Sequence, residues 1–333
     1  MQNKDLNILV TLPAEARHRR RIEAACPGGN FRYVRQEALT PEDVADADVI
    51  LGNIPVALIS ACRNLKLLQL GMAGTDGYPE RMPAGAWLTN SSGAFGLAIS
   101  EHMIGMVLAI CKRLYAYHDN QNRCLWHDEG TVTSLEDAVV LSVGMGSIGG
   151  EFTRKCKALG SYTIGIRRQL REKPAFLDEI HTLDELDELL PRADVVALSL
   201  PSGAETNGLM DARRLRLMKP GAVLVNVGRG KAIVTDALQE VCAEGRIHAA
   251  LDVTDPEPLP PEHPLWTTPN VHITPHISGF FHLSQTHDRI VSIAAQNLER
   301  YCAGEPLLNL VDSRTGYRVE DHRADSPENG RVD

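Results

Sequence analysis

The chain has 333 residues, which is long for one ordinary hydrophobic core, so two domains are expected. Hydrophobic residues make up 43% of the sequence and charged residues 23%, the composition of a globular protein. The formal net charge of −9 argues against nucleic acid or an anionic membrane surface as a partner.

The cysteines and the N-terminal residues bear on the cellular compartment. The seven cysteines are scattered and none forms a C-x-x-C pair, so reduced, buried thiols are expected rather than disulfides or a metal site. The chain begins with polar residues that lead into a strand rather than a signal peptide, and no apolar run reaches membrane-spanning length. A cytoplasmic location is expected.

The first hundred residues alternate short apolar segments with helical ones. Strands are expected over residues 6–12, 31–35, 48–51, 65–70 and 87–89, and helices over 14–25 and 55–61. This alternation is typical of a parallel sheet with helices on both faces.

A turn with two glycines, Gly71–Asp76, follows the strand predicted at 65–70. In parallel α/β sheets, ligands bind beyond the carboxyl ends of the strands. The backbone N–H groups of this turn could hold a small carboxylate, and an ordinary surface loop is the alternative.

One long helix is expected over residues 99–121, where apolar residues recur at helical spacing. A helix of this length suits a connector between two domains. The domain boundary is therefore placed near residue 100.

A glycine-rich unit follows. The apolar run Val139–Val143 reads as a buried strand that leads into Gly144, Gly146 and Gly149 and then into a helix over 148–159. This order of strand, G-x-G-x-x-G turn and helix is that of a dinucleotide site, in which the helix N-terminus faces the pyrophosphate.

The rest of the chain supplies the context that this motif requires. Strands are expected over 162–166, 194–200, 222–227, 249–253 and 271–274, with helices over 183–190, 211–218 and 234–244, as in a doubly wound sheet. A last helix over 284–301 would return the chain to the first domain. The predicted domains are 1–99 with 284–312, and 100–283, followed by a polar tail, 313–333.

The end of the second strand of the dinucleotide unit bears on the choice of cofactor. An NAD site normally has an Asp or Glu there for the ribose 2′-OH, but this strand ends in Arg167 and Arg168, and no carboxylate appears before Glu172. Two arginines could bind the 2′-phosphate of NADP, and two solvated loop arginines are the alternative. We expect NADP to be preferred, with NAD possible.

Three residues that can do chemistry follow predicted strands. Arg229 lies between two glycines and could bind a substrate carboxylate and carbonyl. His276 could carry the proton for reduction of a carbonyl, and Glu257, between two prolines, could fix its tautomer. A structural arginine and a hydrogen-bonded loop histidine are the alternatives.

Asp252 ends the strand expected at 249–253 and leaves two possibilities open. It could accept a hydrogen bond from the nicotinamide amide, or it could cap a local turn. No pair of histidines four residues apart with an acidic ligand indicates a metal, so no metal is expected.

Taken together, these pieces resemble the D-isomer-specific 2-hydroxyacid dehydrogenase family. The matching segments occur in the family's order over nearly the whole chain to about residue 312. They are Gly144–Gly149, Asn226–Gly230, Leu251–Val253 with Glu257–Leu259, and Pro275–Gly279.

The resemblance implies a Rossmann dinucleotide-binding domain inserted into a flavodoxin-like substrate domain. It implies that Arg229 orients the substrate, that His276 is the acid/base with Glu257 as its partner, and that Ala73 and Gly74 hold the substrate carboxylate. Together with the residues argued from the motif itself, the expected cofactor-binding residues are Gly144, Gly146, Ser147, Ile148, Gly149, Arg167, Arg168, Thr206, Val227, Gly228, Asp252, Ser278 and Gly279.

Within the family, Arg167-Arg168 and the run 264–270 resemble the glyoxylate/hydroxypyruvate reductase branch. The expected reaction is NADPH-dependent reduction of a small 2-keto acid to the 2-hydroxy acid. The alternatives are an NAD-dependent phosphoglycerate-type dehydrogenase and a dinucleotide-sensing interaction protein like the corepressors of this fold. The resemblance also implies a homodimer that pairs through the helix expected at 99–121.

Overall fold

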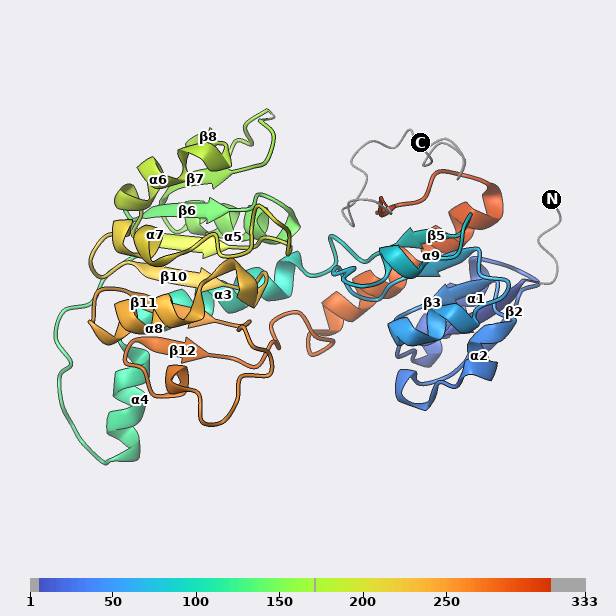
Figure 1. Cartoon of the computed structure of the whole chain (residues 1–333), viewed down its shortest axis with the longest axis horizontal. Coiled ribbons are helices and arrows are strands. Elements are labelled where there is room, and N and C mark those ends of the chain that lie inside the picture. The colour runs from blue at the N-terminus through green and yellow to red at the C-terminus, as the bar shows by residue number, and fades with distance from the viewer. Residues whose placement is uncertain (1–5, 171, 313–333) are drawn as a thin grey trace. The chain divides into compact units, whose positions relative to one another are not determined.

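The computed structural model describes residues 6–170 and 172–312, and the predicted polar tail, 313–333, lies outside these residues. The described chain divides into two compact units, residues 6–95 with 281–312 and residues 96–280 (Figure 1). The first unit is therefore discontinuous in sequence.

The first unit is built around one parallel sheet. Its strands are β1 (Asn7–Val10), β2 (Asn30–Tyr33), β3 (Val49–Leu51), β4 (Leu67–Gln69) and β5 (Trp87–Thr89). Its α-helices are α1 (Ala16–Ala24), α2 (Pro41–Ala45) and α9 (Ser284–Ala303), and its 3₁₀ turns are η1 (Gln36–Ala38), η2 (Val56–Ala61) and η3 (Pro79–Arg81).

The strand order of this sheet, β2-β1-β3-β4-β5, is the flavodoxin-like order. Helices α1 and α9 pack together on one face, and α2 packs with η2 on the other, where Leu9, Ile50 and Leu68 form part of an apolar core. The buried side chain of Asn297 in α9 is bonded to Gln69 Oε1 and to both backbone polar groups of Leu308. These contacts fix the C-terminal part of the unit to β4.

The second unit contains a sheet of seven parallel strands. These are β6 (Val139–Val143), β7 (Tyr162–Ile166), β8 (Glu179–His181), β9 (Val195–Leu198), β10 (Val223–Asn226), β11 (His248–Leu251) and β12 (Val271–Ile273). Its α-helices are α3 (Gly96–Cys111), α4 (Leu114–Asn122), α5 (Ser147–Ala158), α6 (Leu186–Leu189), α7 (Ala212–Leu217) and α8 (Thr235–Ala243). Its 3₁₀ turns are η4 (Leu183–Glu185), η5 (Leu190–Arg192), η6 (Gly230–Ala232) and η7 (Pro264–Trp266).

The order β8-β7-β6-β9-β10-β11-β12 is the doubly wound dinucleotide-binding order with one added edge strand. Helices α3 and α5 pack side by side on one face of this sheet, and α6, α7 and α8 lie over the other (Figure 1). The predicted fold class, two parallel-sheet α/β domains, is confirmed.

The single helix expected over 99–121 is wrong, because the chain forms α3 and α4 with a break between them. Arg113 adopts a left-handed backbone with φ of +54°, which ends the helical path. Its guanidinium donates to the carbonyl of Thr131, and the Lys112 ammonium donates to that of Thr133. Side chains at the break thus bind a returning segment that no local periodicity reveals.

Other elements also differ from expectation, and the short helix α2 was not predicted. The helix predicted at 55–61 is the 3₁₀ turn η2, and β8 was not predicted at all. Strand β8 has only three residues, Glu-Ile-His, all half-buried, so it lacks the apolar run by which the other strands are recognised.

The cysteines are all free thiols in the structure. Five are buried as expected, but Cys302 is half-buried and Cys124 is exposed, contrary to expectation. Burial raises the pKa of the thiols of Cys156 and Cys242 to about 12, so both are protonated at neutral pH. Among the described residues, no helix is both long and apolar enough to cross a membrane.

Candidate active site

The glycine-rich turn between β6 and α5 has the geometry of a dinucleotide cradle. Gly144 has a φ of +104°, a conformation that L-residues rarely adopt. A Cβ atom on Gly149 would lie 1.9 Å from the carbonyl oxygen of Gly144, so only glycine lets the helix pack this close to the turn. A Cβ on Gly146 would meet no protein atom within 4 Å.

The first turn of α5 offers backbone donors beside that open space. Gly146 is the N-cap residue of α5 and no side chain caps the helix. Gly146 and Ser147 are exposed, while Ile148 is half-buried. The first N–H groups of a helix have no partner within it and carry its positive dipole end, so this site suits a phosphate.

Arg167 lies against the same turn. It follows β7 and donates from Nη2 to the carbonyl oxygen of Met145 at 3.1 Å. Its Nε atom is buried, and no described residue accepts a hydrogen bond from it. A buried guanidinium N–H without a partner is costly unless something accepts its hydrogen bond, which fits a bound anionic group. Arg168 is exposed next to it.

The carboxylates of the neighbouring β8 region already have hydrogen-bond partners in the protein. His181, whose carbonyl oxygen binds the Arg167 N–H, lies 2.8 Å from both Glu185 Oε1 and Glu179 Oε2. Partial burial opposes charge on His181, but these two bonds outweigh it and raise its pKa. Arg192, with help from His181, lowers the pKa of Glu179 to about 2. Neither acid replaces the missing ribose ligand after β7.

The residues expected along the cofactor follow β9 and β10. The Thr206 hydroxyl donates to the carbonyl oxygen of Pro201 at 2.7 Å. A Cβ on Gly228 would lie 2.5 Å from the carbonyl oxygen of Leu200, so glycine is needed where the turn after β10 crosses β9. Val227, between this turn and β10, is buried.

Arg229 is presented by a turn that the buried Asn226 side chain organises. Asn226 accepts a hydrogen bond from the Gly228 N–H at 3.0 Å and donates to the Arg229 carbonyl oxygen at 3.0 Å. The Arg229 guanidinium donates to the carbonyl oxygen of Gly228 at 2.9 Å. A Cβ on Gly230 would lie 1.9 Å from the carbonyl oxygen of Thr254, which brings this turn against the loop that carries Glu257.

The structure brings His276 and Glu257 together, as predicted from the sequence. His276 Nδ1 lies 2.5 Å from Glu257 Oε1, although 19 residues separate them in the chain. The two side chains are 47% and 41% exposed, so the pair is accessible to a ligand. A neutral histidine that donates from Nδ1 to this carboxylate keeps Nε2 as a proton acceptor, the arrangement of an acid/base pair.

Asp252 is hydrogen-bonded to Ser278, which lies two residues after His276. Asp252 is 1% exposed, and its carboxylate accepts hydrogen bonds from the Ser278 hydroxyl and N–H, the Ile277 N–H and the Thr274 hydroxyl. Burial raises the pKa of Asp252, but these bonds outweigh it, and the net pKa is lowered. Asp252 is therefore a buried anion. Gly279 follows directly in the chain.

The predicted substrate turn belongs to the first unit. Asn90 Nδ2 donates to the Ala73 carbonyl oxygen at 2.8 Å, and Asn53 Oδ1 accepts from the Gly71 N–H at 3.0 Å. Within the described chain, the N–H groups of Ala73 and Gly74 donate to no other atom. Two unpaired N–H groups on a fixed turn can bind a small carboxylate.

Nothing in the sequence indicated a role for three asparagines: Asn53 and Asn90, which hold the predicted substrate turn of the first unit, and Asn226, which holds the Arg229 turn of the second. Each lies at or just after the carboxyl end of a strand, β3, β5 and β10 respectively. That position was the available signal. In the sequence, the position after a strand end pointed to glycines and ionisable residues as site residues, and the asparagines at the same position received no role.

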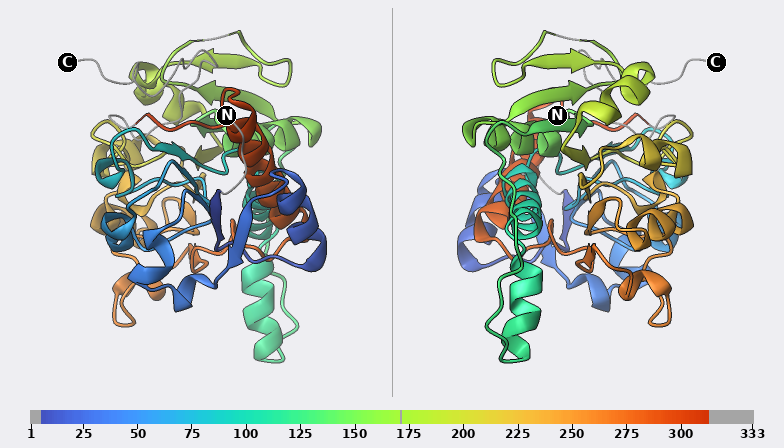
Figure 2. Two further views of the ribbon diagram at one scale, coloured as in Figure 1. Left: turned by 90° about the vertical axis from the view of Figure 1, so that its right-hand side faces the viewer. Right: turned by 90° about the vertical axis from the view of Figure 1, so that its left-hand side faces the viewer.

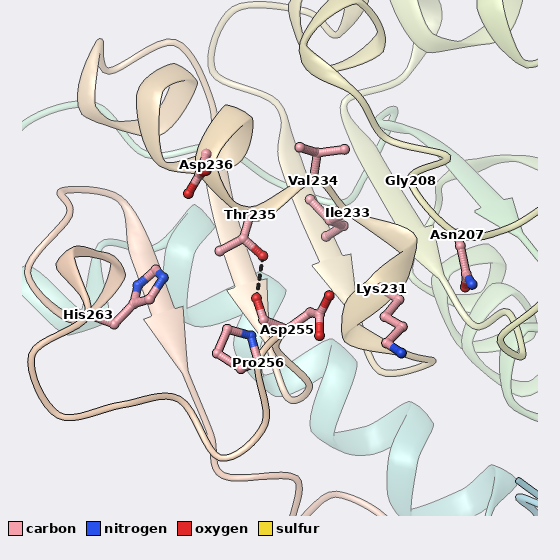
Figure 3. A pocket seen from close by; sticks show the side chains of 10 residues that line it. All are labelled: Asn207, Gly208, Lys231, Ile233, Val234, Thr235, Asp236, Asp255, Pro256 and His263. Atoms are coloured by element: carbon pink, nitrogen blue, oxygen red, sulfur yellow. Dashed lines mark hydrogen bonds between the residues drawn. The ribbon is translucent and has the colours of Figure 1, made fainter. Parts of the chain in front are cut away.

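A separate hollow of about 460 Å³ lies in the second unit and contains none of the predicted site residues (Figure 3). One wall carries Asp236 and Thr235, whose hydroxyl donates to the Asp255 carbonyl oxygen at 2.7 Å. No group of three or more His, Cys, Asp or Glu side chains in the described ranges is arranged to hold a metal ion.

Comparison with known proteins gives matches over most of the chain. Residues 104–278 match the model for the NAD-binding domain of D-isomer-specific 2-hydroxyacid dehydrogenases. A glyoxylate reductase from Thermofilum pendens is 31% identical over 293 residues, which cover 84% of each chain.

Two solved structures are similar over nearly the full length. A D-isomer-specific 2-hydroxyacid dehydrogenase family protein from Aeromonas salmonicida has a TM-score of 0.83 at 31% identity, covering 93% of this chain and 99% of that one. An NADPH-dependent glyoxylate/hydroxypyruvate reductase from Sinorhizobium meliloti, solved with NADP and sulfate, has a TM-score of 0.79 at 26% identity. The shared region covers 94% of this chain and all of that one.

Gly149 and Gly146 of the dinucleotide turn should respond differently to replacement by alanine. Gly149→Ala places a Cβ 1.9 Å from a backbone oxygen, so the free energy of unfolding should fall by at least about 1–3 kcal/mol, measured by urea denaturation. In Gly146→Ala the added Cβ meets no protein atom within 4 Å, so the free energy of unfolding should equal that of the wild type. The added methyl group, however, occupies the space expected for the pyrophosphate. The affinity of this variant for NADPH, measured by fluorescence titration, should fall.

Wild-type stability in Gly149→Ala would contradict the close contact of helix and turn. Wild-type NADPH affinity in Gly146→Ala would contradict placement of the pyrophosphate at this turn.

Proposed function

The chain belongs to the D-isomer-specific 2-hydroxyacid dehydrogenase family, and we propose that it reduces a small 2-keto acid, of the glyoxylate or hydroxypyruvate type, to the 2-hydroxy acid with NADPH. Members of this family are NAD(P)-dependent oxidoreductases. The observation that carries the proposal is the 2.5 Å contact between His276 and Glu257 on the sheet edge where Arg229 also lies.

In the proposed reaction, His276 supplies the proton. The Glu257 carboxylate stabilises the imidazolium through Nδ1–H, and the proton on Nε2 passes to the carbonyl oxygen of the substrate. When bound, the reduced nicotinamide would supply the hydride to the keto carbon. Arg229 would bind the substrate and stabilise negative charge on the reacting oxygen, while the Ala73 and Gly74 N–H groups would hold the substrate carboxylate.

Replacement of His276 tests the acid. His276→Ala should lower kcat for glyoxylate or hydroxypyruvate by about 10²–10⁴-fold, because the proton donor is lost, while the dissociation constant for NADPH stays close to wild type. Stopped-flow or steady-state NADPH oxidation measures the first, and fluorescence titration the second. His263→Asn is a matched control, since the only hydrogen bond of this loop side chain within the described residues is from the Leu265 N–H, which caps η7.

Near-normal turnover in His276→Ala would remove the proposed acid. The substrate panel should include 3-phosphohydroxypyruvate, with NADH as well as NADPH, to distinguish a phosphoglycerate-type dehydrogenase. If the wild-type protein binds NADPH but none of the 2-keto acids causes NADPH oxidation, the result would instead favour a role as a dinucleotide-sensing interaction protein.

We also propose that NADPH is preferred over NADH. Support comes from Arg167, whose buried Nε has no hydrogen-bond partner among the described residues, from Arg168 beside it, and from the absence of an acid at the end of β7. Gly144, Gly146, Ser147, Ile148 and Gly149 would hold the pyrophosphate. Thr206, Val227, Gly228, Ser278 and Gly279 would line the rest of the cofactor.

Neutralising either arginine should weaken NADPH use selectively. Arg167→Gln and Arg168→Gln should each lower kcat/KM for NADPH by about 10–100-fold, the equivalent of one charge-assisted hydrogen bond, and leave kcat/KM for NADH nearly unchanged. Arg154→Gln is the control, because this exposed arginine on α5 pairs only with Glu151 among the described residues. Equal or better kcat/KM with NADH in the wild type would contradict the preference.

We further propose that the enzyme is a homodimer that pairs through the second unit. Helix α4 projects from this unit, and the segment between α4 and β6 returns alongside it (Figure 2). Large apolar side chains are exposed there, with Leu114 53%, Leu125 51% and Trp126 fully exposed. A second copy that covers this projection would bury them.

Light scattering should therefore give the mass of two chains. Trp126→Asp should shift the protein toward monomer, because it places a charge in the proposed interface. Leu159→Asp, at an exposed apolar residue after α5, should leave the mass unchanged. A monomeric wild type at micromolar concentration would overturn the proposed dimer.

A further inference from the structure

Two cysteines that are distant in the sequence meet in the first unit. Cys26 lies two residues after α1, and Cys302 is the second-last residue of α9. The Cys302 thiol donates to Cys26 Sγ at 3.1 Å, although 276 positions separate the two residues. The sulfur atoms of a disulfide lie about 2.05 Å apart, so a movement of about 1 Å would bring this pair to bonding distance.

This contact continues the packing of α1 against α9. Arg17 donates to Asp288 Oδ2 at 3.0 Å, and one turn further along both helices Arg21 donates to the Ser292 hydroxyl at 2.6 Å. The partner positions advance together along the two helices, and the two cysteines follow at the end of the series. The sulfur contact therefore belongs to a helix–helix interface and not to an isolated loop.

The two thiols differ in their access to solvent. Cys26 is 1% exposed, whereas Cys302 is half-buried. A small oxidant can therefore reach Cys302 first, and Cys26 reacts afterwards with the modified Cys302. Burial, together with the contact with Cys26, raises the pKa of Cys302 to about 12, so its thiolate is scarce at neutral pH and the first step is slow.

The cysteine pair lies at the end of the first sheet opposite to the predicted substrate turn. Cys26 precedes β2, which begins at Asn30, and the Gly29 N–H donates to the Cys26 carbonyl oxygen at 3.1 Å. The substrate turn, residues 71–76, instead follows β4, which ends at Gln69. The strands of this sheet are parallel, so the amino end of β2 and the carboxyl end of β4 lie at opposite ends of the sheet.

We propose that Cys26 and Cys302 form a disulfide bond by exchange with a small disulfide such as oxidised glutathione, and that this bond joins α1 to α9 without altering the substrate turn. The inference goes beyond the proposed function and does not depend on it. It departs from the expectation that the cysteines form no disulfides.

The exchange takes place in two steps. The Cys302 thiolate attacks one sulfur of oxidised glutathione, which breaks its S–S bond, forms a mixed disulfide on Cys302 and releases a glutathione thiolate that takes up a proton. The Cys26 thiol then loses its proton and attacks Cys302 Sγ, which releases the second glutathione. Two protein thiols are oxidised, and one glutathione disulfide is reduced to two thiols. Because Cys26 already lies against Cys302, the second step is intramolecular and favoured over attack by another molecule.

The bond would stabilise the folded protein through its effect on the unfolded chain. It closes a loop that spans 276 positions and contains β2 to β12, and with them the whole second unit. A disulfide removes conformational entropy from the unfolded state, and it removes more when the loop is longer. Oxidation should therefore raise the urea concentration at which the protein unfolds. It should leave kcat unchanged, because the bond lies away from the substrate turn.

Peptide mapping tests the bond. Cys124→Ser serves as the parent protein, because the Cys124 thiol is exposed and would react with glutathione by itself. The protein is incubated with oxidised glutathione, its remaining thiols are alkylated, and it is digested without reductant. The digest should contain one pair of peptides joined through Cys26 and Cys302, which a reductant separates.

Two further variants of the parent protein test the order of the steps. Cys26→Ser should retain one glutathione on Cys302, because the second thiol is missing, and Cys302→Ser should leave Cys26 unmodified. A parent protein in which both thiols stay unmodified, or in which Cys302 carries glutathione without being joined to Cys26, would overturn the proposal.

Urea unfolding tests the effect of the bond, with each protein compared before and after oxidation. The midpoint should rise in the parent protein and stay constant in Cys26→Ser and Cys302→Ser. Cys62→Ser is the matched control, because Cys62 is also a buried cysteine of the first unit but donates to the Leu58 carbonyl oxygen at 3.6 Å. This variant should form the bond and show the full rise.

An oxidised parent protein that contains the bond but unfolds at the same urea concentration as the reduced protein would contradict the stabilising role. A fall in kcat on oxidation would contradict the separation of the bond from the substrate turn. A wild type inactive on every 2-keto acid would contradict only the proposed function, since peptide mapping and urea unfolding need no substrate.

Discussion

The arrangement of the predicted catalytic residues depends on the parallel register of three neighbouring strands. Asn226 of β10 pairs with Leu251 of β11, which pairs with Ile273 of β12, so the three strands end at the same level of the sheet. Arg229, Glu257 and His276 follow these ends at short distances along the chain. A slip of two residues in either pairing would move one member of the set by more than 6 Å.

Backbone groups, held by buried polar side chains, then set the local geometry at this edge. Asn226 shapes the turn that presents Arg229, and Asp252 binds the N–H groups that follow His276. The first residue is neutral and the second an anion, but both satisfy backbone groups that would otherwise be buried without partners. The exposed pair His276–Glu257 is consequently supported by groups that have almost no contact with solvent.

On the cofactor side of the sheet, the geometry depends on glycines, because these residues have no side chain. Gly149 and Gly228 sit where a Cβ would overlap a backbone oxygen, and these contacts keep the turns after β6 and β10 close to their neighbours. Positive charge is added only at the end of β7, where Arg167 reaches back to the Met145 carbonyl oxygen. Close packing thus shapes the cradle, and one or two guanidinium groups define what it recognises.

Most of the strands and helices, the position of the dinucleotide turn, and the proximity of Glu257 and His276 could be predicted from the sequence. These depend on local patterns: apolar runs of strand length, glycines at fixed spacing, and reactive residues just beyond strand ends. Three features became evident only in the folded chain: α3 ends before Arg113, β8 is present, and Asp252 faces inward to bind Thr274, Ile277 and Ser278. Each of these features is fixed by hydrogen bonds between residues roughly fifteen or more positions apart, so no local pattern in the chain could reveal them.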